Sequence, residues 1–196
     1  MKTIVFLLEE PSAKEMIEAV LLKLFPDGGI EHRCISFEGK RDLENQLVRK
    51  IRFWNKPNTC FLIMRDQDSE DCRSVKENLK QLVLQTGKEA FCIIRIACHE
   101  LESFFLGDLK AVEQGLGLEG VSKHQNSKKY RNPDNLANAA EEMKKLNQGH
   151  YAKVSGARQI RPYLKLDGSN RSTSFNQLIA GINKALSKLE ESEYVR

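Results

Sequence analysis

Short apolar runs alternate along this chain with stretches in which apolar residues recur every three or four positions. The runs predict strands and the longer stretches predict amphipathic helices. This alternation is typical of an α/β fold, in which helices flank a mainly parallel sheet. The run before position 98 is almost entirely apolar, as expected for a strand buried on both faces. The predicted strands are Thr3–Leu8, Ile30–Phe37, Cys60–Arg65 and Phe91–Ala97.

The helical stretches have start signals of their own. Ser12 is a predicted N-cap, and Glu15 three residues later completes a capping box. A second predicted helix carries Leu43, Leu47, Val48 and Ile51, and a third runs from about Ser69 to Gln85. Beyond Gly107 the chain changes character and becomes mostly helical, with a polar, basic loop in between. The later helices are predicted at Ala111–Leu118, Leu136–Leu146 and Ser174 to about Leu189, and the loop at Val121–Asp134.

The change near Gly107 suggests a division of the chain into two parts. Residues 1–110 form the predicted α/β domain, and residues 111–196 a basic loop with a helical C-terminal extension packed on the same domain. A length of 196 residues suits one sizeable core with such an appendage.

Composition narrows the class of protein. The chain is 40% hydrophobic and 30% charged, and no apolar stretch approaches the ~20 residues of a membrane span. Its five cysteines form no CxxC pair, which indicates reduced core thiols and a cytoplasmic location, with no membrane partner. The net charge of +4 is too small to indicate nucleic-acid binding by itself.

Acidic residues follow three of the predicted strands at their carboxyl ends. Ligands of an open parallel sheet collect at this edge, and crowded carboxylates repel one another unless a cation joins them. Hard oxygen donors suit Mg²⁺ or Mn²⁺. We therefore predict a divalent-metal site with Glu9, Asp66 and Asp68 as ligands. Glu100 is an additional candidate carboxylate, Glu9 can act as general acid or base, and Glu10 and Glu102 are left open as members.

These acidic motifs also have a purely structural explanation. Acids at a helix start are favoured by capping and by the helix dipole, which applies to Asp68 and the residues after it. Glu9 and Glu10 are equally compatible with a solvated strand-to-helix turn.

Basic residues gather after position 120 and are candidates for binding phosphates. Cations neutralise a nucleic-acid backbone while a metal acts at the scissile bond. Such a charge run is also typical of a solvated surface. Tyr130 and Tyr151 are candidates for stacking on bases. The candidate phosphate-binding residues are Lys128, Lys129, Arg131, Lys153, Arg158 and Arg171.

Several short motifs together carry a resemblance to a known family. They include Glu9-Glu10-Pro11-Ser12, Asp66-Gln67-Asp68, Cys98-His99-Glu100-Leu101-Glu102 and Asn170-Arg171-Ser172-Thr173. In this combination and order, and over nearly the whole chain, the sequence resembles a bacterial family known as domain of unknown function 4276. That family is similar to the Toprim fold of topoisomerases, primases and the overcoming-lysogenization-defect nucleases. The resemblance implies a Rossmann-like Toprim fold.

The resemblance also implies a chemistry. Toprim relatives have a glutamate after the first strand, matched by Glu9, and an Asp-x-Asp after the third, matched by Asp66 and Asp68. Together these bind magnesium for phosphodiester cleavage or transfer. Two positions depart from the pattern: Glu10 stands where many relatives have glycine, and Arg65 precedes the first aspartate. Strand alternation places Arg65 on the opposite face from Asp66.

The leading expectation is a Mg²⁺-dependent nuclease acting on DNA or RNA, including transfer RNA. Its relatives are often encoded beside ATPases in phage-defence loci, which implies an ATPase partner. Two alternatives stay open: a non-catalytic module that binds nucleic acid or protein, and a metal-dependent phosphohydrolase acting on small phosphates. The sequence does not indicate the oligomeric state.

Overall fold

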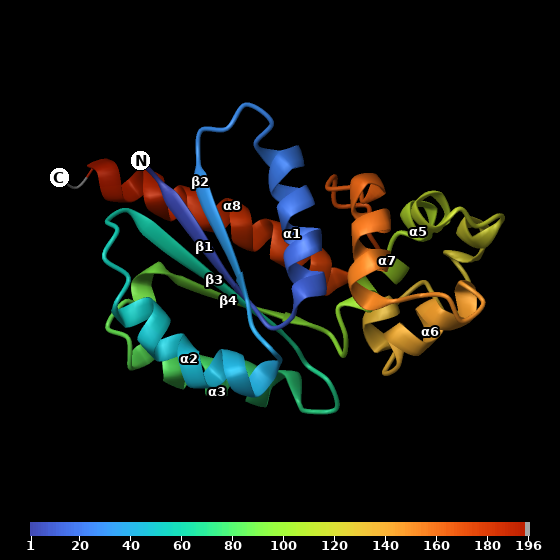
Figure 1. Ribbon diagram of the computed structural model, residues 1–196, viewed down its shortest axis with the longest axis horizontal. Helices are drawn as coiled ribbons and strands as arrows, with labels where there is room; N and C mark the ends of the chain where they lie inside the picture. The colour runs from blue at the N-terminus through green and yellow to red at the C-terminus, as the bar shows by residue number, and fades with distance from the viewer. Residues whose placement is uncertain (195–196) are drawn as a thin grey trace.

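The computed structural model describes the backbone of residues 1–194 and the side chains of residues 1–191. Its centre is a single sheet in the order β2-β1-β3-β4, and each adjacent pair of strands is parallel (Figure 1). The carboxyl ends of all four strands therefore lie at one edge. The strands are β1 (Thr3–Leu8), β2 (Glu31–Ser36), β3 (Thr59–Asp66) and β4 (Cys92–Ala97).

Helices cover both faces of the sheet. The two central strands, β1 and β3, are buried along their whole length, and their alternate side chains enter two separate hydrophobic clusters. Phe6 and Leu62 face one cluster, while Val5 and Ile63 face the other. The first cluster lies under α1 (Pro11–Leu24) and α8 (Thr173–Tyr194), and the second under α2 (Lys40–Arg52) and α3 (Cys72–Leu84). The predicted α/β fold with a mainly parallel sheet is confirmed.

The residues between β4 and α8 form a group of short helices beyond the carboxyl edge of the sheet (Figure 1). Within this group α7 contacts α5, and α6 contacts α4. Helix α7 also contacts α1, which covers the sheet. The basic stretch predicted as a loop contains only short 3₁₀ turns. The helices are α4 (Glu102–Leu106), α5 (Leu109–Leu116), α6 (Ala139–Leu146) and α7 (Lys153–Ile160), and the 3₁₀ turns are Glu89–Phe91, Val121–His124, Pro133–Asn135 and Arg161–Tyr163.

Two predicted helix starts are wrong. Helix α1 begins at Pro11 with Glu10 as its N-cap residue, because proline is well suited to the first helical position. The Ser12 hydroxyl consequently lies inside the helix and donates to the Glu10 carboxylate instead of capping. Helix α3 begins at Cys72, three residues later than predicted, because the Asp71 carboxylate accepts a hydrogen bond from the Ser74 amide at 2.9 Å.

The later helices differ from their predicted bounds by a few residues. Helix α5 begins and ends two residues earlier than predicted, and α6 begins at Ala139 because the residues around Pro133 form a separate 3₁₀ turn. Helix α8 continues past Leu189. Helix α4, only five residues long, was not predicted.

Two further observations concern the helices and the cysteines. Within residues 1–194, no helix combines the length and apolar character needed to cross a membrane. The five cysteines are all unpaired thiols, as their spacing predicts.

Candidate active site

Asp66, the last residue of β3, lies at the centre of the candidate site. Its side chain is 6% exposed. Its backbone amide donates to the Glu9 carboxylate at 2.9 Å, and its own carboxylate accepts from the Leu101 amide at 3.1 Å. Because Glu9 follows β1 and Leu101 follows β4, three strand ends meet at Asp66. The structure thus brings together Glu9 and Asp66, two of the predicted ligands.

Three other acids lie close enough to Asp66 to act on its charge: Glu9, Glu10 and Glu102. We call these three residues and Asp66 the carboxylate cluster. Burial raises the pKa of Asp66 well above its ordinary value, and the negative charges of the other three acids raise it further. Burial likewise raises the pKa of Glu9, although the hydrogen bond from the Asp66 amide acts in the opposite direction. The cluster therefore favours binding of a proton or a cation.

Glu102 brings a completely buried carboxylate to the cluster from helix α4. One of its oxygens accepts a hydrogen bond from the Tyr151 hydroxyl at 3.1 Å. The other oxygen, Oε2, has no hydrogen-bond partner among the described residues. Burial raises the pKa of Glu102. A buried carboxylate oxygen without a partner is costly, so this atom is available to bind a cation or a proton donor.

Lys153, at the start of α7, lies beside the carboxylate cluster. Its Nζ atom is 3.3 Å from a carboxylate oxygen of Glu10 and 3.9 Å from Oε2 of Glu102. The charges of Glu102, Glu10 and Asp66 raise its pKa against the opposing effect of burial. Sequence analysis assigned Lys153 to a phosphate-binding surface, whereas the structure places its ammonium group among the acids.

Asp68 forms an ion pair with a lysine of α2. It has a positive φ of 55°, and its carboxylate lies 2.8 Å from Nζ of Lys40 on α2. Arg65 points to the face of β3 opposite Asp66, as predicted, and its guanidinium lies 2.6 Å from both Glu44 and Glu70. The negative charge of Asp68 contributes to the raised pKa of Glu9, and its role as a metal ligand stays a prediction.

Glu100 has a different partner. Its carboxylate accepts a hydrogen bond from the Ala140 amide at 2.7 Å, in the first turn of α6. An acid at this position stabilises the start of a helix through the unpaired amides and the dipole. Its role as an additional carboxylate of the site stays a prediction, although its charge contributes to the raised pKa of Glu102.

The donor set can be compared with what a divalent cation needs. Among residues 1–191, no three Asp, Glu, His or Cys side chains converge on a point where a metal ion would be held. Magnesium, however, usually takes only one or two carboxylates and completes its shell with water and substrate phosphate. Glu9 and Asp66, with the unpartnered oxygen of Glu102 nearby, fit that requirement in their chemistry.

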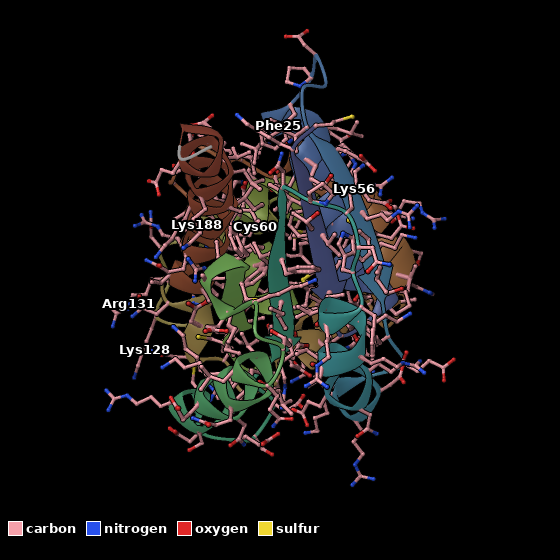
Figure 2. All side chains as sticks on the ribbon, turned by 90° about the vertical axis from the view of Figure 1, so that its left-hand side faces the viewer. Phe25, Lys56, Cys60, Lys128, Arg131 and Lys188 are labelled. Carbon is pink, nitrogen blue, oxygen red and sulfur yellow. The ribbon has the colours of Figure 1, made fainter. Side chains whose placement is uncertain are left out.

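The predicted phosphate-binding residues are dispersed. Three of them are engaged within the protein: Lys129 with Glu142 at 2.6 Å, Arg158 with Glu15 at 2.6 Å, and Arg171 with Asn126 at 2.9 Å. Lys128 and Arg131 are exposed and extend outward from the molecule (Figure 2).

The prediction that Tyr130 and Tyr151 stack on bases is wrong. Both rings are buried, and their hydroxyls donate to Glu142 and Glu102 respectively. Aromatic residues in a basic stretch of sequence give no sign of whether the ring lies inside, so only the structure separates the two cases.

Comparison with known proteins agrees with this architecture. The structure is similar to the C-terminal region of the Burkholderia pseudomallei OLD protein, with a TM-score of 0.54 and 16% sequence identity over 96% of this chain and 97% of that one. This similarity shows a shared fold and supports the predicted Toprim-like architecture. No curated protein matches the chain. The model of the family described as "Domain of unknown function (DUF4276)" matches residues 8–183, and the chain belongs to that family.

Proposed function

We propose that the protein is a nuclease that hydrolyses phosphodiester bonds of DNA or RNA with Mg²⁺ or Mn²⁺. The observation that carries this proposal is the carboxylate cluster, in which a buried Asp66 with a raised pKa lies beside Glu9 at the carboxyl edge of the sheet. The motif resemblance to Toprim nucleases and the similarity in fold to the OLD region support it.

Asp66 and Glu9 would hold the ion, and Asp68 would join them if its ion pair with Lys40 opens. When bound, such an ion would polarise a phosphoryl oxygen. Lys153 would neutralise charge on the scissile phosphate, since its ammonium group already lies among acids at the same place. If Glu9 does not hold the ion, it would act as general acid or base, a role that its raised pKa favours over that of an ordinary glutamate.

Residues outside the cluster would hold the rest of the nucleic acid. Lys128 and Arg131 are exposed and are the favoured phosphate contacts of the predicted set. An ATPase partner and a role in phage defence belong to the same proposal. They are supported by the family resemblance and by the fact that the similar structure is one region of a larger protein.

Calorimetric titration of Mg²⁺ and Mn²⁺ tests the metal site without a choice of substrate. Wild type should bind, and Asp66→Asn should lose at least about tenfold in affinity, since the ion would lose a charged ligand. Glu141→Gln removes one exposed carboxylate elsewhere and is the matched control, with affinity expected to stay at the wild-type value. Equal affinity in the Asp66→Asn variant and wild type would remove the proposed site.

Cleavage assays then separate the nuclease from its two alternatives. DNA, RNA, transfer RNA and nucleoside triphosphates are incubated with the metal-loaded protein and with Asp66→Asn. Fragments of the polynucleotides in the wild-type reaction, and none in the Asp66→Asn reaction, would support a nuclease. Release of inorganic phosphate from nucleotides alone would identify a phosphohydrolase, and nucleic-acid binding indifferent to metal and to Asp66 would identify a non-catalytic module.

A further inference from the structure

The open edge of the sheet along β4 has a groove that the proposed nuclease does not use. β4 is the last strand of the sheet, and a cavity of about 440 Å³ lies along it between α3 and α8. The lining includes Cys92 to Arg95, at the start of β4, whereas the carboxylate cluster lies beyond the opposite end of the strand. Figure 2 views the molecule from the side on which Lys188, one of the lining residues, is labelled.

The groove combines an apolar floor with a positive rim. Ile93, Ile94 and Val83 form part of the floor, and Leu84 beside them is 53% exposed. Five cations and two acids contribute to the lining, so it has a charge excess of three. The cations are Lys76, Lys80, Arg95, Lys184 and Lys188, and the acids are Glu77 and Glu89.

Most of these cations have partners inside the protein, and two do not. Arg95 donates to the Gln177 carbonyl at 2.6 Å, Lys188 donates to the Ala90 carbonyl at 2.8 Å, and Lys80 pairs with Glu77. Lys76 and Lys184, one from each flanking helix, have no ion-pair partner in the described part of the chain. An incoming segment would therefore meet uncompensated positive charge on both sides.

We propose that this β4 edge binds an extended, acidic segment of a protein partner as an additional strand. An edge strand presents amides and carbonyls that no neighbouring strand pairs, to which an extended peptide can add through main-chain hydrogen bonds. One of these carbonyls, that of Ile94, accepts a hydrogen bond from Nη1 of Arg95 at 2.9 Å, which an added strand would replace. Side chains of the added strand would alternate between the α3 side and the α8 side, where Lys76 and Lys184 respectively would attract acids. A second copy of this chain fits poorly, because two-fold pairing of this edge would place the same cations against one another.

Fluorescence anisotropy with a defined probe tests the proposal on the full chain. The probe is a labelled peptide of about nine residues, the length of a long strand, in which Glu-Glu and Val-Val pairs alternate so that acids face both flanking helices. Saturable binding is expected, and the double variant Lys76→Glu/Lys184→Glu should weaken it by at least about tenfold through charge repulsion. Lys145→Glu/Lys165→Glu makes the same charge change at exposed positions elsewhere and should leave binding within about twofold of wild type.

Two measurements distinguish strand addition from general attraction of an acid. A probe with proline at its centre should bind at least about tenfold more weakly, because proline removes a main-chain donor. Amide hydrogen exchange of β4 should slow when the unmodified probe binds. Equal binding of the two probes, unchanged exchange in β4, or no saturable binding would overturn the proposal.

Sedimentation of the free protein tests the competing occupant. A monomer supports the proposal. If the protein is a dimer and the double variant Lys76→Glu/Lys184→Glu changes its dimerisation, the edge binds a second copy of the chain and the proposal is overturned. Because none of these measurements depends on metal or cleavage, they give an answer whether or not the proposed nuclease activity is found.

Discussion

At the scale of single residues, the end of β3 separates two opposite charges that are neighbours in the sequence. Arg65 points toward α2 and the turn before α3, where Glu44 and Glu70 neutralise its buried guanidinium. Of the carboxylate cluster it approaches Glu9, at 3.9 Å from its Nε atom. Asp66 points to the opposite face and enters the carboxylate cluster. Strand alternation thus prevents the arginine from neutralising the aspartate next to it, and Asp66 stays available for another cation.

Replacing Asp66 with asparagine should stabilise the metal-free protein. The substitution keeps an acceptor for the Leu101 amide and removes a buried negative charge that three other acids oppose. We expect a gain of about 1 kcal/mol in the free energy of unfolding near neutral pH, the ordinary scale of a single substitution. Urea denaturation without metal measures it, and Mg²⁺ should then stabilise wild type but not the variant. A loss of stability in metal-free Asp66→Asn would show that the charge of Asp66 is compensated inside the protein.

The ion pair between Lys40 and Asp68 makes a second prediction at this scale. If Asp68 is a metal ligand, Lys40 competes with the metal for its carboxylate. Lys40→Met should therefore raise Mg²⁺ affinity about two- to fivefold, since a half-exposed ion pair contributes ~0–1 kcal/mol. Calorimetry measures the change, and Lys145→Met is the control for the loss of one positive charge. The gain should vanish in an Asp68→Asn background, and its persistence there would exclude Asp68 from the site.

At the scale of elements, α7 completes the candidate site. Its first residue, Lys153, lies at the carboxylate cluster, while Arg158 and the adjacent Arg161 pair with Glu15 and so anchor α7 to α1. Gly115 allows α5 to pack closely on α7, because a side chain there would lie 2.6 Å from the Cα atom of Ile160. The position of Lys153 therefore depends on the packing of three helices.

Gly156→Ala tests this dependence. A methyl group at position 156 would overlap the ring of Tyr151, which donates its hydroxyl hydrogen to the buried Glu102. We expect a loss of about 1–3 kcal/mol of stability from overpacking, together with weaker Mg²⁺ binding from the displaced Tyr151. Denaturation and calorimetry measure the two effects. Tyr151→Phe is the companion variant, because it removes the hydrogen bond to Glu102 without a steric overlap. Wild-type stability and wild-type Mg²⁺ affinity in both variants would show that this packing does not support the site.

A pH dependence is expected where α5 meets the following turn. The Glu113 carboxylate accepts hydrogen bonds from the amide and the hydroxyl of Ser122, and with the nearby Lys110 these lower its pKa to about 2. A lowered folded-state pKa contributes stability that is present above the unfolded value near 4.5 and is lost as the pH falls toward 2. Glu113→Gln should thus be less stable than wild type at pH 6, with the difference shrinking between pH 4.5 and 2. Thermal unfolding across this range measures it, and a constant difference would contradict the pKa shift.

The elements also show what the sequence could predict. All four strands were found within a residue or so. For β1 and β3 the reason is that a parallel strand covered on both faces leaves a continuous apolar run, whereas β2 is a partly exposed strand of mixed composition. Helix starts were less accurate: a proline and an aspartate that were not weighed as starting signals determined α1 and α3. The position of Lys153 beside the carboxylate cluster was not predicted, because its contacts with Glu10 and Glu102 join residues far apart in the sequence, which periodicity does not reveal.

At the scale of the whole molecule, the net charge of +4 conceals a strong local separation. Acids gather at the carboxyl edge of the sheet, and many of the later cations are already paired inside the protein. Sequence composition sums these charges and therefore predicts neither the cluster nor the availability of any cation. Of the six predicted phosphate-binding residues, Lys128 and Arg131 have no ion-pair or hydrogen-bonded side-chain partner within the described residues.

These two residues should dominate the salt dependence of nucleic-acid binding. Lys128→Ala/Arg131→Ala should lower the slope of log affinity against log salt by about 2, since each lost phosphate contact removes roughly one released counterion. Lys129→Ala/Arg158→Ala removes the same charge from cations paired with Glu142 and Glu15 and should change the slope less. Anisotropy titrations of duplex DNA and RNA at several salt concentrations measure both. An equal effect of the two double variants would place the phosphates elsewhere.

The wide spacing of the site along the chain has a consequence for biosynthesis. Glu9, Asp66, Glu102 and Lys153 are contributed in succession, and α8, which covers β3 and β4, is made after all of them. A growing polypeptide can assemble its early strands while the acids still lack their lysine and the sheet still lacks one of its covering helices. Any hydrolytic capacity of this centre is therefore acquired only after α7 and α8 have been made, so that the early strands pass some time beside ribosomal RNA before the centre is complete.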